Sequence, residues 1–191
     1  MYSPEALEHV YNLLSTHELM VEVFVKGKAY IEKHIFENLD QVGITESHIR
    51  YVRKTRQPYK NVLNMMIKNK ENIENININF ANKQDRKLIK EKLMELKHIT
   101  ITSSSDHNIE IGGETTSKAS ALKVLCNKLE VSPECIMACG DSTNDEDMLK
   151  VAGLPVAMGN AKDSVKAMAK YITSTNDEDG VAAAIKKFAF K

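Results

Sequence analysis

The second half of the chain alternates between helical and strand patterns. We predict helix 117–129, strand 135–139, helix 144–151, strand 155–158, helix 162–169, strand 171–173 and helix 180–188. Short apolar strands separated by helices are typical of a parallel sheet with helices on its faces. These strands are too few for a complete doubly wound domain. We therefore predict an α/β fold that holds only the C-terminal half of a Rossmann-like parallel-sheet core.

The first part of the chain is rich in Asn, Lys and Ile, whereas the part after Gly112-Gly113 is rich in Ala, Gly and Asp. Upstream of the glycines we predict helix 4–16, strands 20–25 and 29–31, a helical stretch from Ile35, a strand from Ile76 to Phe80, helix 83–97, and strands 99–101 and 109–111. Helix 83–97 is expected to bury Leu88, Ile89, Leu93 and Leu96. Hairpins mixed with helices indicate an antiparallel sheet with helices on one face, an α+β domain. The predicted domains are thus 1–111 and 112–191.

Charge and composition exclude several classes of protein. Lys plus Arg and Asp plus Glu number 26 each, so the zero net charge gives no reason to expect nucleic acid or an anionic membrane as a partner. The sequence has no apolar run long enough to span a bilayer and no secretory pattern at its start. Three cysteines in a chain without an export signal favour reduced thiols. We therefore expect a cytoplasmic location.

Two other patterns are interpreted structurally. Cys135 and Cys139 lie in an apolar run and have no further Cys or His at zinc-ligand spacing, so we expect them to pack in a buried strand. A basic stretch is interleaved with tyrosines and contains Arg50, Arg53, Lys54, Arg56 and Lys60. A nucleic-acid surface is one interpretation of it, but the neighbouring acidic residues and the zero net charge favour a solvated edge.

The clearest chemical signal runs from Gly140 to Met148. Apolar residues 136–138 lead directly into Gly140-Asp141, so Asp141 is expected at the carboxyl end of a parallel strand, where open α/β sheets bind ligands. Carboxylate oxygens there suit Mg²⁺. An EF-hand is excluded, because Glu146 replaces the required Gly and Ala152 the final Glu. A helix start whose acidic residues merely complement the dipole remains an alternative.

This stretch resembles the fourth motif of the Cof-type phosphatases of the haloacid dehalogenase superfamily. The match runs through Gly140-Asp141-x-x-Asn144-Asp145 and Met148-Leu149, then through residues 152–153, 156–161 and 175–181. Upstream, Thr116-Ser117-Lys118 resembles the third motif, in which a lysine opens a helix. The first hundred residues resemble the family's α+β cap only in the order of their elements.

The resemblance implies a role for each matching residue. Asp141 would ligate Mg²⁺, and Asp145 would hold the loop and orient Lys118. Lys118 would neutralise the phosphate and the attacking carboxylate, and Asn144 would donate to a phosphate oxygen. Without these partners Lys118 would be read as an ordinary solvated helix lysine. Asn176-Asp177 is also a good helix start, so it is left outside the catalytic set.

The family's nucleophile, an Asp in Asp-x-Asp-x-Thr after the first core strand, has no counterpart in these residues. The Asp-x-Asp pairs here are Asp145/Asp147, inside the metal motif, and Asp177/Asp179, which follows a polar stretch. The resemblance therefore implies a truncated Mg²⁺-dependent hydrolase of small phosphate monoesters, such as sugar phosphates or phosphorylated cofactors. It would act through an aspartyl-phosphate whose nucleophile lies outside this chain.

We accordingly expect the chain as given to be inactive. We also expect it to self-associate or to pair with the missing N-terminal segment, because half a sheet leaves an open edge. The alternative is a non-catalytic pseudo-enzyme or binding module derived from the same fold.

Overall fold

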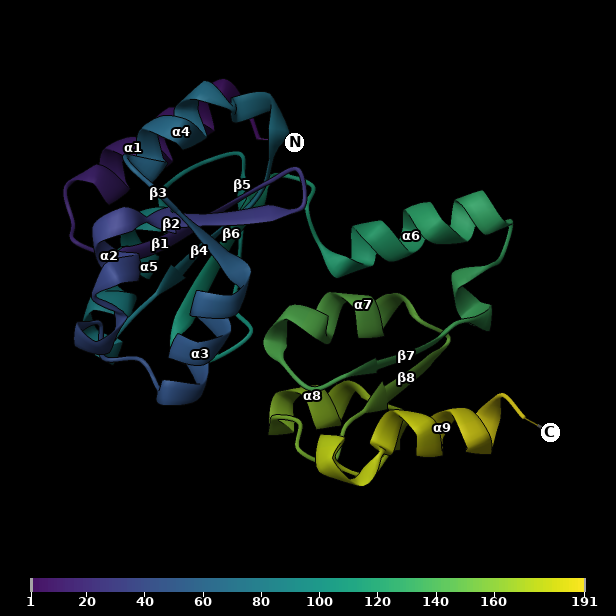
Figure 1. Cartoon of the computed structure of the whole chain (residues 1–191). Helices are drawn as coiled ribbons and strands as arrows, with labels where there is room; N and C mark the ends of the chain where they lie inside the picture. Colours follow the sequence, from purple (N-terminus) through teal and green to yellow (C-terminus); the bar gives the residue numbers. More distant parts are fainter. Residues whose placement is uncertain (1, 191) are drawn as a thin grey trace. The chain divides into compact units, whose positions relative to one another are not determined.

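The computed structural model describes residues 2–190 and divides the chain into two compact units, Met1–Thr115 (unit 1) and Thr116–Lys191 (unit 2). The division falls between residues 115 and 116, close to the boundary expected between 111 and 112. Figure 1 shows a sheet with helices in each unit. Across residues 2–190, no helix combines the length and the apolar character needed to cross a membrane.

Within residues 2–115, unit 1 combines six strands with five α-helices and two short 3₁₀ turns, labelled η. In chain order they are α1 (Pro4–Ser15), β1 (Met20–Val25), β2 (Lys28–Glu32), α2 (Lys33–Glu37), η1 (Leu39–Gln41), α3 (Glu46–Thr55), β3 (Arg56–Tyr59), α4 (Val62–Lys68), η2 (Lys70–Asn72), β4 (Ile73–Asn79), α5 (Lys83–Met94), β5 (Ile99–Thr102) and β6 (Asn108–Gly113).

The unit 1 sheet has the order β3-β2-β1-β4-β6-β5. All neighbouring strands are antiparallel except β2 and β3, which run parallel. The hairpin between β1 and β2 turns at Lys26 and Gly27, whose φ angles of 50° and 71° lie in the left-handed region that a tight two-residue turn requires. The predicted antiparallel sheet is therefore slightly mixed, because the edge strand β3 follows a helix and not a hairpin.

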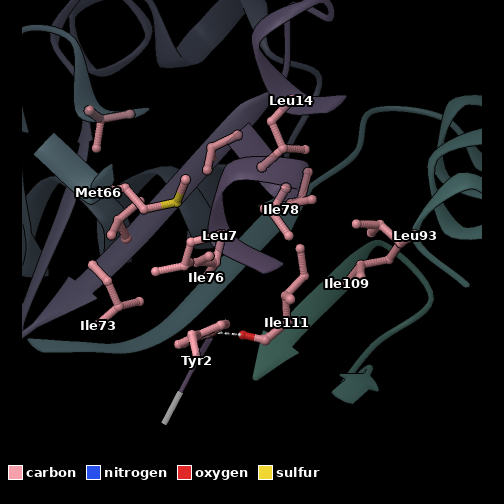
Figure 2. Close-up of a cluster of buried hydrophobic side chains, with 14 of the residues drawn as sticks. Tyr2, Leu7, Leu14, Met66, Ile73, Ile76, Ile78, Leu93, Ile109 and Ile111 are labelled. Atoms are coloured by element: carbon pink, nitrogen blue, oxygen red, sulfur yellow. Dashed lines mark hydrogen bonds between the residues drawn. The ribbon is translucent and has the colours of Figure 1, made fainter. Parts of the chain in front are cut away.

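One face of this sheet carries the main core of unit 1. Alternate strand residues point to the same side, so Val23, Ile76 and Ile111 all contribute to one buried cluster. Helices α1, α4 and α5 add their apolar residues to it, among them Leu7, Met66 and Leu93 (Figure 2). Tyr2 lies at the end of the cluster, where its hydroxyl donates to the carbonyl of Ile111. Burial raises the pKa of the Tyr2 phenol above its ordinary value.

Helices also cover part of the opposite face, contrary to the prediction that they lie on one face only. A second buried cluster joins Met20 of β1 and Ile31 of β2 to residues of α2, η1 and α3. Met20 points away from the first core because the next strand residue, Val21, belongs to that core. The sheet therefore has helices on both sides at its β1–β2 end.

A buried ion pair lies beside this second cluster. Glu22 is 0% exposed, and its two carboxylate oxygens accept from Nε and Nη2 of Arg56 at 2.9 and 3.0 Å. Asn77 Nδ2 donates to the same carboxylate at 2.8 Å. Desolvation works to lower the pKa of Arg56, but Glu22 raises it above its ordinary value. The interpretation of the basic stretch as a solvated edge is wrong for Arg56, because this side chain turns inward to satisfy a buried carboxylate.

Unit 2 contains a three-stranded sheet of order β7-β8-β9, in which both strand pairs are parallel. Its elements are α6 (Lys118–Leu129), η3 (Pro133–Cys135), β7 (Met137–Gly140), η4 (Thr143–Asp145), α7 (Glu146–Val151), β8 (Leu154–Ala157), α8 (Asp163–Met168), β9 (Tyr171–Ile172), η5 (Asn176–Glu178) and α9 (Gly180–Phe188). The predicted α/β architecture with a parallel sheet is confirmed. Its core joins β7 and β8 to α7 and α8.

Two residues expected in a core are exposed. Cys135 lies on the surface, because Pro133 begins a 3₁₀ turn and β7 starts only at Met137. Cys139 is within β7 and half-buried. Leu88 is 46% exposed, whereas its neighbour Ile89 is 1% exposed, so the buried stripe of α5 is narrower than the sequence pattern suggested.

Helix α5 offers a matched test of this packing. Leu93→Ala removes a side chain that is 0% exposed and should destabilise unit 1 by about 2–5 kcal/mol. Leu88→Ala, on the same helix, should change stability by less than about 0.5 kcal/mol. Tyrosine fluorescence in urea titrations reports mainly on unit 1, since the chain has six tyrosines, no tryptophan, and only Tyr171 outside unit 1. Equal effects of the two substitutions would contradict this packing.

Candidate functional site

The candidate site is the loop that follows β7 at the carboxyl end of the unit 2 sheet. The strand ends at Gly140, and the chain then turns through Asp141 and Ser142 into η4. A Cβ on Gly140 would lie 2.5 Å from Cβ of Asp145. A side chain at position 140 would therefore displace Asp145, so the glycine allows that carboxylate to lie directly against the end of the strand.

Asp145 connects the parts of this loop. Its Oδ2 accepts from the backbone amides of Asp141 and Ser142, at 3.0 and 3.2 Å. Its Oδ1 accepts from Lys118 Nζ at 2.5 Å. One carboxylate thus fixes the turn after β7 and also ties it to the start of α6.

Lys118 is the first residue of α6. The helix begins there because Ser117 caps it, its hydroxyl accepting from the amide of Ser120 at 3.0 Å. A positive charge at the start of a helix opposes the helix dipole. The ion pair with Asp145 offsets that cost. The Lys118 side chain remains 50% exposed, so its ammonium is also accessible to an anion from solvent.

The electrostatics of Asp145 follow from these contacts. Burial by itself would raise the pKa of this carboxyl group. The hydrogen bond from Lys118 and those from the amides of Asp141 and Ser142 outweigh burial and lower the Asp145 pKa below its ordinary value. Asp145 is therefore ionised at neutral pH, which keeps it an acceptor for all three donors.

Asp141 begins a chain of contacts across the loops that follow the three strands. Its Oδ2 accepts from Asn160 Nδ2 at 3.1 Å. Asn160 Oδ1 in turn accepts from the backbone amide of Asn176 at 3.0 Å. Asp141 follows β7, Asn160 follows β8 and Asn176 follows β9, and parallel strands present their carboxyl ends at one edge of a sheet. The three residues therefore mark that edge.

Asn144 lies within the same loop, in η4. It is half-buried, and within the described residues its Oδ1 is buried without a hydrogen-bond partner. A buried polar atom left unpaired is destabilising and is rare in proteins. Among the described residues, no group therefore donates to this buried acceptor.

Two predicted site residues, Lys118 and Asp145, are in direct contact, and Asp145 also binds the backbone of Asp141. The carboxylate of Asp141 contacts Asn160. Asn160 lies in the matching stretch 156–161, but no role was predicted for it from sequence. The signal that could have identified it is its position, since it follows β8 as Asp141 follows β7.

The Asp141 carboxylate could contribute one ligand to a hard divalent cation whose other ligands are mostly water and phosphate oxygens. Asp141 presents an exposed carboxylate at the strand end. Among residues 2–190, no cluster of three or more His, Cys, Asp or Glu side chains could enclose a metal ion. Mg²⁺ suits such a site, because it is typically bound by one or two carboxylates and completes its shell with water and phosphate oxygens.

Comparison with known proteins gives the same family as the motifs. Residues 2–185 match the family model of the haloacid dehalogenase-like hydrolases. The chain is 52% identical over 101 residues to the 5-amino-6-(5-phospho-D-ribitylamino)uracil phosphatase YcsE of Bacillus subtilis, covering 53% of this chain and 41% of the relative. It is 47% identical over 88 residues to the phosphatase YwpJ of Bacillus subtilis, covering 46% of this chain and 31% of that protein.

Solved structures match nearly the whole chain. A haloacid dehalogenase-like hydrolase from B. subtilis superposes with a TM-score of 0.80 at 26% identity, over 96% of this chain and 70% of that one. A haloacid dehalogenase-like hydrolase from Bacteroides thetaiotaomicron gives a TM-score of 0.75 at 27% identity, over 97% of this chain and 67% of that one. The chain spans less than half the length of the two curated relatives above.

The pKa of Asp145 tests the network. An NMR titration of the carboxyl carbons should place it below about 3.9, the ordinary Asp value. Lys118→Met should raise it, whereas Lys150→Met, which removes the partner of the exposed Asp147, should leave it unchanged. Because the folded pKa is depressed, its stabilising effect is present above about pH 3.9 and is lost as the pH falls through the folded value. An Asp145 pKa at or above 3.9, or one insensitive to Lys118→Met, would contradict the network.

Proposed function

The chain belongs to the haloacid dehalogenase-like hydrolases, and from that premise we propose that unit 2 carries the phosphate-binding and metal-binding half of a phosphate monoester hydrolase. The observation that carries this proposal is the contact of Lys118 Nζ with Asp145 Oδ1 at 2.5 Å, beside Asp141. It supplies a fixed, half-exposed cation next to an accessible carboxylate at the carboxyl end of a parallel sheet. Phosphoryl transfer mainly requires such positioning and charge stabilisation.

In this proposal each residue of the loop has one task. Asp145 stays ionised and holds Lys118 in place. Lys118, whose side chain is 50% exposed, neutralises negative charge on the phosphate and on the attacking carboxylate through its ammonium group. Asn144 donates from its amide nitrogen to a phosphate oxygen, as the family resemblance implies, and its position in η4 beside Asp145 supports this role.

Asp141 is the proposed metal ligand, with Mg²⁺ as the ion. When bound, Mg²⁺ would stabilise the charge that develops on the transferring phosphoryl group. Asn160 holds the Asp141 carboxylate through its amide, and Asn176 fixes Asn160 through its backbone. These two asparagines are positioning residues, because they act through Asp141.

The nucleophile is proposed to lie in a segment outside these 191 residues, where an aspartate would form the aspartyl-phosphate. The proposed substrates are small phosphate monoesters, either sugar phosphates or phosphorylated cofactors. The relative YcsE, named for a phosphorylated ribitylaminouracil, supports this class. A cytoplasmic, reducing setting belongs to the same proposal, since all three cysteines are unpaired. A pseudo-enzyme that binds phosphorylated ligands without turnover is the alternative.

Metal binding and turnover test the proposal separately. Titration of the chain with Mg²⁺ in the presence of phosphate should shift the NMR signals of Asp141 and Asn160. Asp141→Asn should weaken Mg²⁺ binding at least about tenfold, which corresponds to about 1.4 kcal/mol. Asp147→Asn, a control in the same loop region with an exposed carboxylate, should leave it unchanged. The chain alone should not hydrolyse aryl or sugar phosphates.

Turnover that persists through stringent purification and disappears with Asp141→Ala would show that the nucleophile is within the chain. Equal Mg²⁺ binding by Asp141→Asn and the unmodified chain would remove Asp141 from the metal site.

Exposed apolar residues and an open strand edge in unit 2 support the proposal that another segment or chain binds to this unit. Helix α6 packs on α7, and Ala119 and Cys126 are its buried residues. Three large apolar residues of α6 are nevertheless more than half exposed: Val124 at 55%, Leu125 at 52% and Leu129 at 62%. Among the described strands, β7 pairs only with β8, so its other side is an open edge. Apolar patches and open strand edges favour association.

We expect a strand-bearing segment from outside these residues to cover the β7 edge and α6. The isolated chain should self-associate through the same surface at micromolar concentration in sedimentation experiments. Leu125→Lys should shift it toward the monomer, whereas Leu88→Lys, at a similarly exposed leucine in unit 1, should not. A monomeric unmodified chain whose unit 2 is fully protected in hydrogen exchange would contradict this expectation.

A further inference from the structure

A cavity of ≈ 480 Å³ lies within unit 1, where β1 begins and β4 ends. Three of its lining residues are apolar and at most 9% exposed: Met20, Ile35 and Phe80. Met20 and Ile35 belong to one buried cluster and Phe80 to the other. Its other lining residues come from β4, from the loop before β1, from α2 and η1 with the residues that flank η1, from the loop after β4, and from the first turn of α5, which contributes Asp85. This volume and partly apolar lining are typical of sites for small molecules.

One polar side chain of the lining has no partner. Asn79 lines the cavity and is 5% exposed, and within residues 2–190 its Nδ2 donates to no group. The neighbouring asparagines on this face of the sheet are satisfied, since Asn77 donates to Glu22 and Asn108 donates to Asn77. An unpaired buried amide is costly, and each instance in a protein requires an explanation.

Packing alone does not explain the asparagine. Asn79 lies directly opposite Met20 in the β1–β4 pair, and Met20 belongs to an apolar cluster. An apolar residue of similar size at position 79 would extend that cluster without leaving a buried donor. The position therefore favours an acceptor that enters from the cavity. A carbonyl oxygen, carried on a ring that covers Met20 and Ile35, would satisfy both the donor and these apolar residues.

The rim of the cavity is acidic. Glu18 and Asp85 line it with exposed side chains, and no described Lys or Arg does so. His34 is the remaining titratable lining residue. The two carboxylates favour a positive group on the outer part of the occupant and disfavour a negative one.

We propose that this cavity is a binding site for a small cyclic or aromatic molecule that carries a carbonyl group for Asn79 Nδ2 and a positive charge toward Glu18 and Asp85. The site is built wholly from unit 1 and does not depend on the function proposed for unit 2. It lies near the Asn108 end of β6, which pairs with Asn79, whereas the chain continues toward unit 2 from the Gly113 end.

Three matched probes test the carbonyl contact with Asn79 and the preference for a positive charge separately. 4-(Aminomethyl)benzamide, benzamide and 4-carbamoylbenzoate share a ring and an amide carbonyl and differ in carrying a positive charge, no charge and a negative charge. In ¹⁵N NMR titrations of the full chain, the cation should bind at least threefold more tightly than benzamide, and the anion more weakly than both. The shifts should centre on Met20, Ile35 and the side-chain amide of Asn79.

Variants identify the groups responsible. Asn79→Leu should weaken binding of all three probes at least fivefold while leaving the thermal midpoint of unit 1 unchanged or higher. Asn75→Leu, on the same strand and face but outside the cavity lining, should leave binding unchanged. Glu18→Gln should reduce the preference for the cation over benzamide, whereas Glu8→Gln, at an exposed glutamate outside this cavity, should not. If Asn79→Leu fails to fold, Asn79→Ala serves the same comparison.

Several results would overturn the proposal. One is the absence of any shift at the Asn79 side chain up to the solubility limit of the probes, with an ordered water as its only partner in a crystal structure. Unchanged affinity in a folded Asn79 variant would also do so. A lower thermal midpoint in Asn79→Leu together with unchanged probe binding by Asn79→Ala would assign Asn79 a structural role.

Discussion

The Asp145 side chain is 6% exposed, yet it carries a charge that has to be matched inside the protein. Two backbone amides at the turn and one lysine provide that match. The requirement explains the residues around it. Gly140 leaves the space that the carboxylate occupies, and Ser117 starts α6 where Lys118 can reach the carboxylate. Breaking a buried pair by removing one partner costs more than the pair contributes, so these positions are interdependent.

The sequence predicted part of the site for a physical reason. An apolar strand followed by Gly-Asp places Asp141 at the carboxyl end of a parallel strand, and this inference needs only local information. The partner of Lys118 was inferred from family resemblance, because a lysine at a helix start has no intrinsic preference for one carboxylate. The Asp141–Asn160–Asn176 chain was not predicted. It depends on the register in which Gly140 pairs with Ala157, and Ala157 with Ile172, which the local sequence does not reveal.

Unit 1 shows where local pattern reasoning fails. Strand β3 was missed because Arg56-Gln57-Pro58-Tyr59 has no apolar alternation, and the proline fits only because β3 is an edge strand. Its identity as a strand depends on the parallel pairing with β2 and on the contact of Arg56 with buried Glu22. Both are tertiary interactions. The helices α1 and α5 were predicted because their apolar spacing is visible within a single segment.

The two units differ in how completely they bury their apolar side chains. Unit 1 buries two apolar clusters on the faces of one sheet and pairs its buried charge. Unit 2 has one small cluster built largely from alanines, and its helix α6 presents apolar residues on more than one side. A helix that is apolar over most of its surface is usually buried. The loop that carries Asp141 leaves from β7, which is an edge strand among the described strands. Motion of β7 therefore also moves Asp141. A segment that pairs with the open edge of β7 would hold both the strand and the candidate site in place.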